Sequence, residues 1–178
     1  MSDFDPRQTE PPTQSGGGLS VNQKLKKLFF GSYTHNIDSK GRVIIPIAYR
    51  EALGENFVIS VTHNFDAIAI YTEEVFYDIF TKMQKYDDRQ KRISDYNRRF
   101  FSCSFIDQQC DSQGRALIPM KLRNKILKDA KDVTFVSTGK YIIMQPTLDF
   151  DKDFDDFMND PDKDYEEYLS LVHEEDAR

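Results

Sequence analysis

The chain has 178 residues, of which 39% are hydrophobic and 30% charged, and its formal net charge is -6. This length suffices for one compact domain, or for two very small ones that share a core, and the composition is that of a folded, soluble protein. The sequence has no run of ~18 apolar residues, the length of a membrane span, and begins without the basic-then-apolar order of a secretory signal, so a cytoplasmic location is expected.

The negative charge is concentrated towards the C-terminal end. Residues 1–28 carry four basic and three acidic side chains, residues 29–150 carry 17 and 15, and residues 151–178 carry three and 12. The three net charges are therefore +1, +2 and -9. The central part is weakly basic although the whole chain is acidic, which is mild evidence for a DNA partner.

Residues 1–28 are predicted to form a disordered N-terminal arm. The first 20 or so are rich in Pro, Gly, Ser, Thr and Gln, a composition that cannot bury enough apolar surface to offset the loss of chain entropy. Lys24, Lys26 and Lys27 follow, where the arm meets the first apolar residues. These lysines could touch phosphate, but a solubilising junction is the simpler interpretation.

An internal repeat organises the next part of the chain. IDSKGRVIIPIAYREAL at residues 37–53 aligns with CDSQGRALIPMKLRNKI at residues 110–126, with seven identical residues in 17 and five further positions that pair two apolar residues. The agreement continues into two strand-like segments after each copy, FVISV and IAIY in the first half and VTFVS and IIMQ in the second. Each half is therefore predicted to contain a strand, a turn, a strand, a short helix and a hairpin.

A helical segment is predicted to close each half. Residues 72–83 place apolar side chains on one helical face, as the helical period requires. Residues 147–158 space Phe150, Phe154 and Phe157 in the same way and have an acidic outer face.

A basic helix is predicted to connect the halves. DDRQKRISDYNRRFF mixes charge with Ile93, Tyr96 and Phe100 at helical spacing, so one side packs and the other is exposed. Three aspartates lie among its basic residues, which favours an ordinary solvated face over a DNA-binding patch. The predicted division is an N-terminal arm at 1–28, a first repeat at 29–86, the connecting basic helix at 87–102, a second repeat at 103–150 and an acidic C-terminal tail at 151–178.

The motif Asp-Ser-x-Gly-Arg lies near the start of each repeated unit and predicts a tight turn. The Asp carboxylate can accept hydrogen bonds from nearby backbone N–H groups, and Gly supplies the positive φ that such a turn often needs. An Arg held by this turn is preorganised for contact with a phosphate or a guanine edge. An internal Asp–Arg salt bridge that only orients the turn is an equally good interpretation of the spacing. The residues are Asp38, Gly41 and Arg42 in the first copy and Asp111, Gly114 and Arg115 in the second.

A second arginine follows in each unit. The strand after the turn ends at Pro46 or Pro119, a good start for a helix, and that short helix carries another arginine. Two arginines in each of two copies suggest a pseudo-twofold module that matches the repeated phosphates and grooves of duplex DNA. The candidate DNA-binding residues are Arg42, Lys40, Arg115, Arg50 and Arg123.

Catalysis and metal binding find little support in the sequence. The Asp–Arg pairs lack a neighbouring nucleophile, and there is no Gly-rich phosphate loop. Cys103 and Cys110 are too isolated for a zinc site, and the three histidines are scattered without metal-binding spacing. The sequence therefore predicts no enzyme, no cofactor, no metal site and no small-molecule substrate.

The repeated units resemble the MraZ family, regulators found with the bacterial division and cell-wall gene cluster. The resemblance covers about residues 29–150 and runs from FFGSYTHNIDSKGRVIIPIAYREALG through RRFFSCSFIDQQCDSQGRALIPMKLR. It implies a double-split β-barrel of the AbrB-like type, in which two motifs of one chain replace two subunits. The expected fold class is therefore α+β, with short helices and a helical C-terminal tail.

The same resemblance implies an activity and a set of residues. The activity is sequence-specific binding to tandem short repeats in the promoter of its own operon, chiefly as a repressor, by a ring-like homo-oligomer that associates with the nucleoid and needs no cofactor. The arm before Leu28 and the acidic tail are longer than family members usually show. The family motif falls on Asp38 and Arg42 and on Asp111 and Arg115, and the AbrB-like arginine of the following helix falls on Arg50 and Arg123.

A protein-interaction module is the alternative function. The acidic tail would then engage a protein partner, and DNA binding would be secondary. Tyr165, Tyr168, Leu169 and Val172 lie at helical spacing, so the tail could dock as an amphipathic helix. The same residues could equally pack on their own barrel.

Overall fold

The computed structural model describes residues 20–86 and 89–176. Most of the predicted N-terminal arm, residues 1–19, lies outside the described residues, as do residues 87–88 of the connecting segment and residues 177–178 of the tail. None of the described helices is both long enough and apolar enough to cross a membrane.

The first half of the described chain follows the predicted order of strand, turn, strand, short helix and hairpin. Its elements are α1 (Val21–Leu25), β1 (Ser32–Asn36), β2 (Arg42–Ile44), α2 (Ile47–Leu53), β3 (Phe57–Val61), β4 (Ile68–Thr72) and α3 (Glu73–Gln84). The helix expected between the halves is α4 (Lys91–Ser102).

The second half repeats this order and adds a final helix. Its elements are β5 (Phe105–Gln108), β6 (Arg115–Leu117), α5 (Met120–Leu122), the π-helix η1 (Arg123–Leu127), β7 (Asp132–Ser137), β8 (Ile142–Pro146), α6 (Thr147–Asn159) and α7 (Pro161–Asp176).

Helical structure begins inside the segment that the sequence assigned to the disordered arm. α1 starts with a capping box, in which the Gln23 N–H donates to Ser20 Oγ at 3.3 Å and the Ser20 N–H donates to Gln23 Oε1 at 2.9 Å. This pair satisfies two N–H groups that a helix start otherwise leaves unpaired. Amino-acid composition alone does not reveal this local capping signal.

The strands of the two halves interleave in one antiparallel sheet. Six strands lie in the order β1-β7-β8-β4-β3-β5, and β2 pairs with β6 in a separate ribbon. The first strand of each half pairs with the third strand of the other, as β1 does with β7 and β5 with β3. β4 and β8 pair with each other. The duplicated sequence thus folds as one pseudo-twofold α+β unit with a shared, mostly antiparallel sheet.

The core is supplied by both halves. β3 is buried at every position, including the polar Ser60, and β4 at all but its last. This burial on both faces explains why the two strands are mostly apolar and show no alternation of apolar and polar residues. Tyr49, Phe57 and Tyr71 from the first half and Phe100 and Phe135 from the rest are among the largest fully buried side chains. Burial of each such side chain stabilises the fold by about 1.5–3 kcal/mol.

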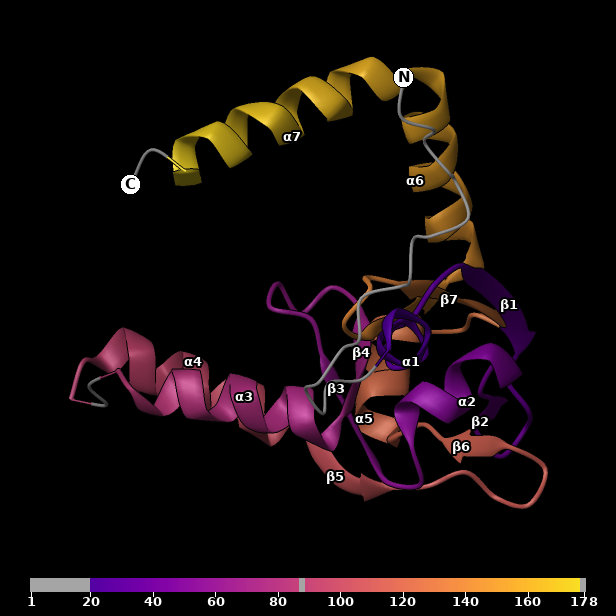
Figure 1. Cartoon of the computed structure of the whole chain (residues 1–178). Helices are drawn as coiled ribbons and strands as arrows, with labels where there is room; N and C mark the ends of the chain where they lie inside the picture. Colours follow the sequence, from indigo (N-terminus) through magenta and orange to yellow (C-terminus); the bar gives the residue numbers. More distant parts are fainter. Residues whose placement is uncertain (1–19, 87–88, 177–178) are drawn as a thin grey trace, which may run out of the picture.

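α3 and α4 lie side by side and project from the body (Figure 1). Thr72 caps α3, since its Oγ1 accepts a hydrogen bond from the Val75 N–H at 3.2 Å. Phe100 of α4 is fully buried, and its ring stacks on Phe76 of α3 with centres 6.2 Å apart. The described basic residues of α4 are exposed, which is compatible with both interpretations of this helix, a solvated face and a DNA-binding patch.

The short helix of the second half departs from that of the first. α2 ends at Gly54, whose φ of 82° lets the chain turn away. The aligned position in the second copy is Leu127, so the chain runs one residue further, forms η1, and turns at Lys128 with a φ of 52°. The extra residue widens the last turn of the helix into a π-helical turn, in which the Lys128 N–H donates to the Arg123 oxygen.

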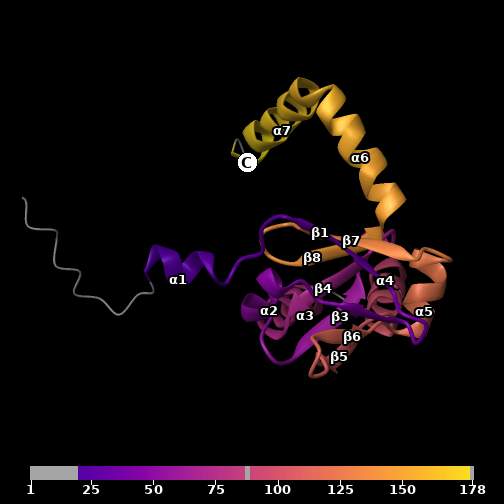
Figure 2. The same cartoon turned by 90° about the vertical axis from the view of Figure 1, so that its right-hand side faces the viewer.

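The C-terminal tail is helical, as predicted. α6 contacts β7 and β8, and α7 follows a break before Pro161. In both views the two helices rise from the body on the side away from β6 (Figures 1 and 2).

Candidate nucleic-acid interface

The two copies of the repeated motif meet in the β2–β6 ribbon. Its register places Arg42 opposite Leu117, Val43 opposite Ala116, and Ile44 opposite Arg115. The central pair is buried, and side chains alternate across a strand. The outer face of the ribbon therefore carries two arginines and two apolar residues, arranged diagonally about the pseudo-twofold.

An aspartate fixes the turn before each strand of the ribbon. Asp38 Oδ1 accepts hydrogen bonds from the backbone N–H groups of Lys40 and Arg42, both at 2.9 Å. Gly41 has a φ of 78°. The second turn repeats both bonds at 3.0 Å, and its Gly114 has a φ of 74°. The turn geometry predicted from the motif is confirmed.

The same aspartates bind the two ribbon arginines. Arg42 Nε and Nη2 donate to Asp38 Oδ2 at 2.8 and 2.7 Å. Arg115 binds Asp111 in the same way, at 2.9 and 2.7 Å. Arg42 Nη1 also lies 3.7 Å from Asp111 Oδ2, so the two turns are joined. Both arginine side chains are 26% exposed, which leaves part of each guanidinium accessible.

These contacts lower the pKa of both carboxyls to about 2. For Asp38 the main causes are the backbone N–H and then the side chain of Arg42, and for Asp111 they are the side chain and then the backbone N–H of Arg115. Both aspartates are ionised at neutral pH, so the two pairs together are electrically neutral. The internal salt bridge that the spacing allowed is present.

The arginines of the short helices reach the turn of the other half. Arg50 Nε donates to the backbone oxygen of Ile45 at 2.8 Å. Its guanidinium occupies the space beside Gly114, where a Cβ would lie 2.1 Å from Arg50 Cζ. Arg123 lies against Gly41 in the same manner, with Nη1 1.3 Å from the position of a Cβ. Each glycine thus supplies a positive φ and makes room for an arginine of the other half.

Backbone hydrogen bonds repeat this exchange between the halves. The Ile45 N–H donates to the Gly114 oxygen at 2.9 Å, and the Ile118 N–H donates to the Gly41 oxygen at 3.0 Å. The sequence singled out the helix arginines as DNA contacts and missed their packing on the opposite turn. The available signal was that both copies share the glycine and the later arginine at identical spacing.

Lys40 breaks the symmetry of the turns. Lys40 is exposed at the tip of the first turn, and the aligned residue of the second turn is the uncharged Gln113. The first turn therefore offers one positive charge that the second lacks.

Four exposed apolar residues of the ribbon and the short helices were not among the candidate residues. Ile44 and Leu117 are 41% and 58% exposed, and Ile47 and Met120 at the starts of the short helices are 81% and 66% exposed. In the alignment of the two copies, Ile44 corresponds to Leu117 and Ile47 corresponds to Met120. Ile44 and Leu117 share the outer face of the ribbon with the two arginines, and exposed apolar groups on one face mark an interaction surface.

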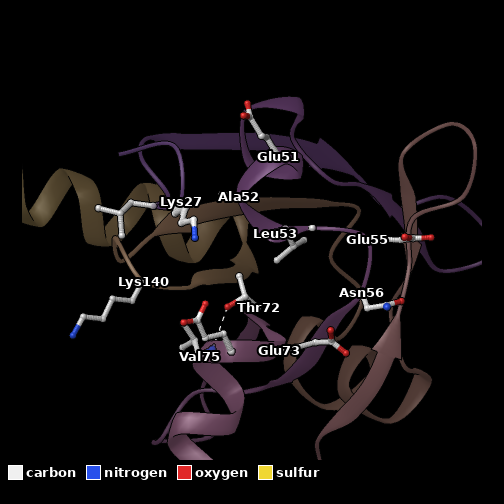
Figure 3. A pocket seen from close by; sticks show the side chains of 13 residues that line it. Lys27, Glu51, Ala52, Leu53, Glu55, Asn56, Thr72, Glu73, Val75 and Lys140 are labelled. Carbon is white, nitrogen blue, oxygen red and sulfur yellow. Dashed lines mark hydrogen bonds between the residues drawn. The ribbon is translucent and has the colours of Figure 1, made fainter. Parts of the chain in front are cut away.

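A hollow of about 460 Å³ lies elsewhere, among side chains from α2, the start of α3 and the β7–β8 turn (Figure 3). Four glutamates and two lysines line it, and its carboxylates would repel phosphate. Lys26 precedes the lining residue Lys27 in the sequence, and its Nζ forms a salt bridge with Glu51 Oε1 at 3.4 Å. Among the described residues, no three His, Cys, Asp or Glu side chains are grouped so as to hold a metal ion.

The chain is similar to proteins of one family. A family model described as "MraZ protein, putative antitoxin-like" matches residues 28–98. A protein of Thermoanaerobacter sp. (strain X514) is 38% identical over 113 residues, which cover 63% of this chain and 76% of that protein. A protein of Ligilactobacillus salivarius is 36% identical over 117 residues, 65% of this chain and 80% of that protein.

A third relative extends the similarity over most of both chains. This protein of Alkaliphilus oremlandii is 30% identical over 148 residues, which cover 83% of this chain and 98% of that protein. All three relatives carry the name Transcriptional regulator MraZ, which describes a regulator and not an enzyme. The chain therefore belongs to the MraZ family.

Proposed function

We propose that this chain is a transcription regulator that binds double-stranded DNA in a sequence-specific way. It acts as a repressor on tandem short repeats in the promoter of its own division and cell-wall gene cluster, in the cytoplasm and at the nucleoid, without a cofactor. The observation that carries the proposal is the β2–β6 ribbon, which presents Arg42 and Arg115 at pseudo-twofold-related positions on one face. The interleaved strands support an AbrB-like double-split β-barrel as the scaffold.

The ribbon supports base reading better than simple charge attraction. A two-stranded β-ribbon fits the major groove of duplex DNA. Each ribbon arginine gives one edge of its guanidinium to an aspartate, and the remaining N–H groups can donate to the O6 and N7 of guanine. Ile44 and Leu117 lie beside them and suit the methyl group of thymine. Because the Asp–Arg pairs are neutral, they add little to nonspecific attraction by phosphate.

Lys40 supplies a phosphate contact in this proposal, and the helix arginines act through the turns. Lys40 is exposed at the tip of the first turn, where a lysine can approach the DNA backbone. Arg50 and Arg123 lie against the glycines of the opposite turns. They are positioning residues for Arg115 and Arg42, and replacing either would alter DNA binding by loosening the turn that holds the reading arginine.

Assembly of several copies completes the proposal. The described residues of one chain form one such ribbon, and the central region has a net charge of only +2, which favours weak binding to one short site. A ring-like homo-oligomer would place several ribbons near tandem repeats and raise their effective concentration. Spacing of the repeats by about one helical turn of DNA would bring successive sites to the same face.

A binding titration tests the proposed function. Labelled DNA from the promoter region is compared with DNA of shuffled sequence, and one repeat is compared with several. We expect tight binding to several repeats, weaker binding to one, and a much lower affinity for shuffled DNA. Equal affinity for promoter and shuffled DNA over a range of salt would refute sequence-specific recognition.

A second candidate function is capture of a protein partner by the acidic tail, with DNA binding secondary. It is favoured by the exposed aromatic residues of the tail, which include Phe154, Tyr165 and Tyr168. Removal of residues 151–178 would then abolish partner capture and leave DNA binding intact. Loss of assembly in the truncated chain would instead indicate that the tail contacts other copies of the chain.

A further inference from the structure

The α6–α7 arm, residues 147–176, presents aromatic side chains that its own fold leaves uncovered. Phe154 and Phe157 are 49% and 45% exposed. Phe150 stacks on Phe154 with ring centres 5.7 Å apart, so one face of α6 is aromatic. The remainder of the arm is acidic, since it contains 13 Asp or Glu residues and two Lys. The arm is thus an amphipathic acidic segment without a partner surface for its aromatic face.

A groove of the opposite charge lies beside α4. One apolar hollow of about 360 Å³ is lined by Ile93 and Tyr96, and another of about 470 Å³ by Phe65 and Cys103. The rings of Tyr96 and Phe65 contact each other with centres 5.7 Å apart, so the two hollows adjoin. No carboxylate of the described residues lines either hollow. The rim of this basic groove carries Arg92, Lys121 and Lys125.

The aromatic face of α6 does not lie in the groove of its own chain. α6 begins on β7 and β8 and continues for 13 residues, a length of ~20 Å. Both views show it rising away from the body (Figures 1 and 2). Phe154 and Phe157 lie in its second half, beyond the part of α6 that packs on the sheet. The groove of a second copy is therefore the site that we consider for this face.

We propose that the α6–α7 arm of one copy lies in the basic groove of a second copy of this chain. Phe154 and Phe157 contact the apolar floor, and the acidic flanks of the arm face the basic rim. An amphipathic helix in an apolar groove is a common mode of recognition, and opposite charges fix its orientation. Each copy has one arm and one groove, so two copies can exchange arms reciprocally in a closed dimer, or successive copies can bind head-to-tail and close into a ring. The inference does not depend on DNA binding.

A disulfide at the proposed contact provides the test. Cys103 lines the groove as a free, half-buried thiol. The full chain with Phe157→Cys, oxidised and run on a non-reducing gel, should form covalent dimers and larger species that disappear on reduction. Cys103→Ser in the same chain should lower the yield about tenfold or more, whereas Cys110→Ser should leave it unchanged.

Asp156→Cys is the matched control. Asp156 is adjacent to Phe157 but lies on another flank of α6, so its cross-link to Cys103 should be about tenfold weaker. Both positions are exposed, and equal melting curves would verify that both variants fold. A disulfide within one chain, which migrates as a compact monomer, would place the arm in its own groove and overturn the proposal. Equal yields from the two variants would overturn it as well.

Charge reversal tests the rim independently of the disulfide. Arg92→Glu combined with Lys125→Glu should lower the interchain cross-link of the Phe157→Cys chain about tenfold at low salt. Asp151→Lys with Asp153→Lys on the arm should restore it, because these residues flank the aromatic face of α6. Unchanged yields in the groove variant would contradict the proposed role of the rim.

Discussion

Replacing Gly114 with Ala should destabilise the fold through two separable effects. Gly114 has a φ of 74°, a conformation that costs an L-residue about 1–2 kcal/mol. The new Cβ would lie 2.1 Å from Arg50 Cζ, so the guanidinium must move and lose its 2.8 Å hydrogen bond to the Ile45 oxygen. A partly exposed bond from a charged donor contributes about 1 kcal/mol. The total of about 2–3 kcal/mol should lower Tm by about 4–12 °C.

A double-mutant cycle with Arg50→Ala separates these effects by urea denaturation at one fixed protein concentration. Gly114→Ala should cost about 1 kcal/mol less in the Arg50→Ala background than in the parent. Gly139→Ala is the matched control, because Gly139 has a φ of 85° and a Cβ there would meet open space among the described residues. The effects of Gly139→Ala and Arg50→Ala on the free energy of unfolding should be additive. Additivity at Gly114 as well would refute the packing of this arginine on the opposite turn.

Three further predictions follow from the ribbon and the core. The folded-state pKa of Asp38 and Asp111 is about 2, below the ordinary 3.8, so their stabilisation is present above about pH 4 and is lost as the pH falls towards 2. Replacing both aspartates with Asn should make the free energy of unfolding less dependent on pH in the acid range, and an unchanged pH dependence would contradict this prediction. Arg42→Ala should weaken binding to promoter repeats by about 1–3 kcal/mol per site, and a base-reading role predicts a loss confined to one base position, measured with single-base DNA variants. Tyr49→Phe removes a partly buried 2.5 Å hydrogen bond to the backbone oxygen of Gly31. It should lower the free energy of unfolding, measured in urea, by about 1 kcal/mol, and no change would argue against that bond.

The local geometry of the site could be predicted from the sequence because it is encoded by adjacent residues. The turn needs only an Asp, a Gly three residues later and an Arg next to it, and these are Asp38, Gly41 and Arg42 in the first copy. The strands β3, β4, β7 and β8 could be predicted for the same reason, since each is a short run rich in apolar and β-branched residues.

The pairing between the halves could not be read from local sequence. Arg50 packs on Gly114 only because β2 lies next to β6. The residues of either segment alone do not specify this pairing. The π-turn in the second half reflects one residue, Leu127 in place of a glycine, and a shift of this kind lies within the usual uncertainty of helix ends. The exposure of Ile47 and Met120 could not be predicted, because the sequence shows only that both are apolar residues that follow a proline.

DNA binding by paired ribbon variants tests the proposed function most directly. Arg42→Ala with Arg115→Ala is compared with the parent and with Arg98→Ala, in fluorescence anisotropy titrations on promoter repeats and shuffled DNA. Arg98 is a matched control, because it also pairs with an aspartate, Asp95 at 2.9 Å, but lies on α4. The ribbon variant should lose its preference for the repeats while Arg98→Ala keeps it. If the ribbon variant melts earlier yet binds the repeats like the parent, the arginines serve only the turns and the proposed interface is wrong.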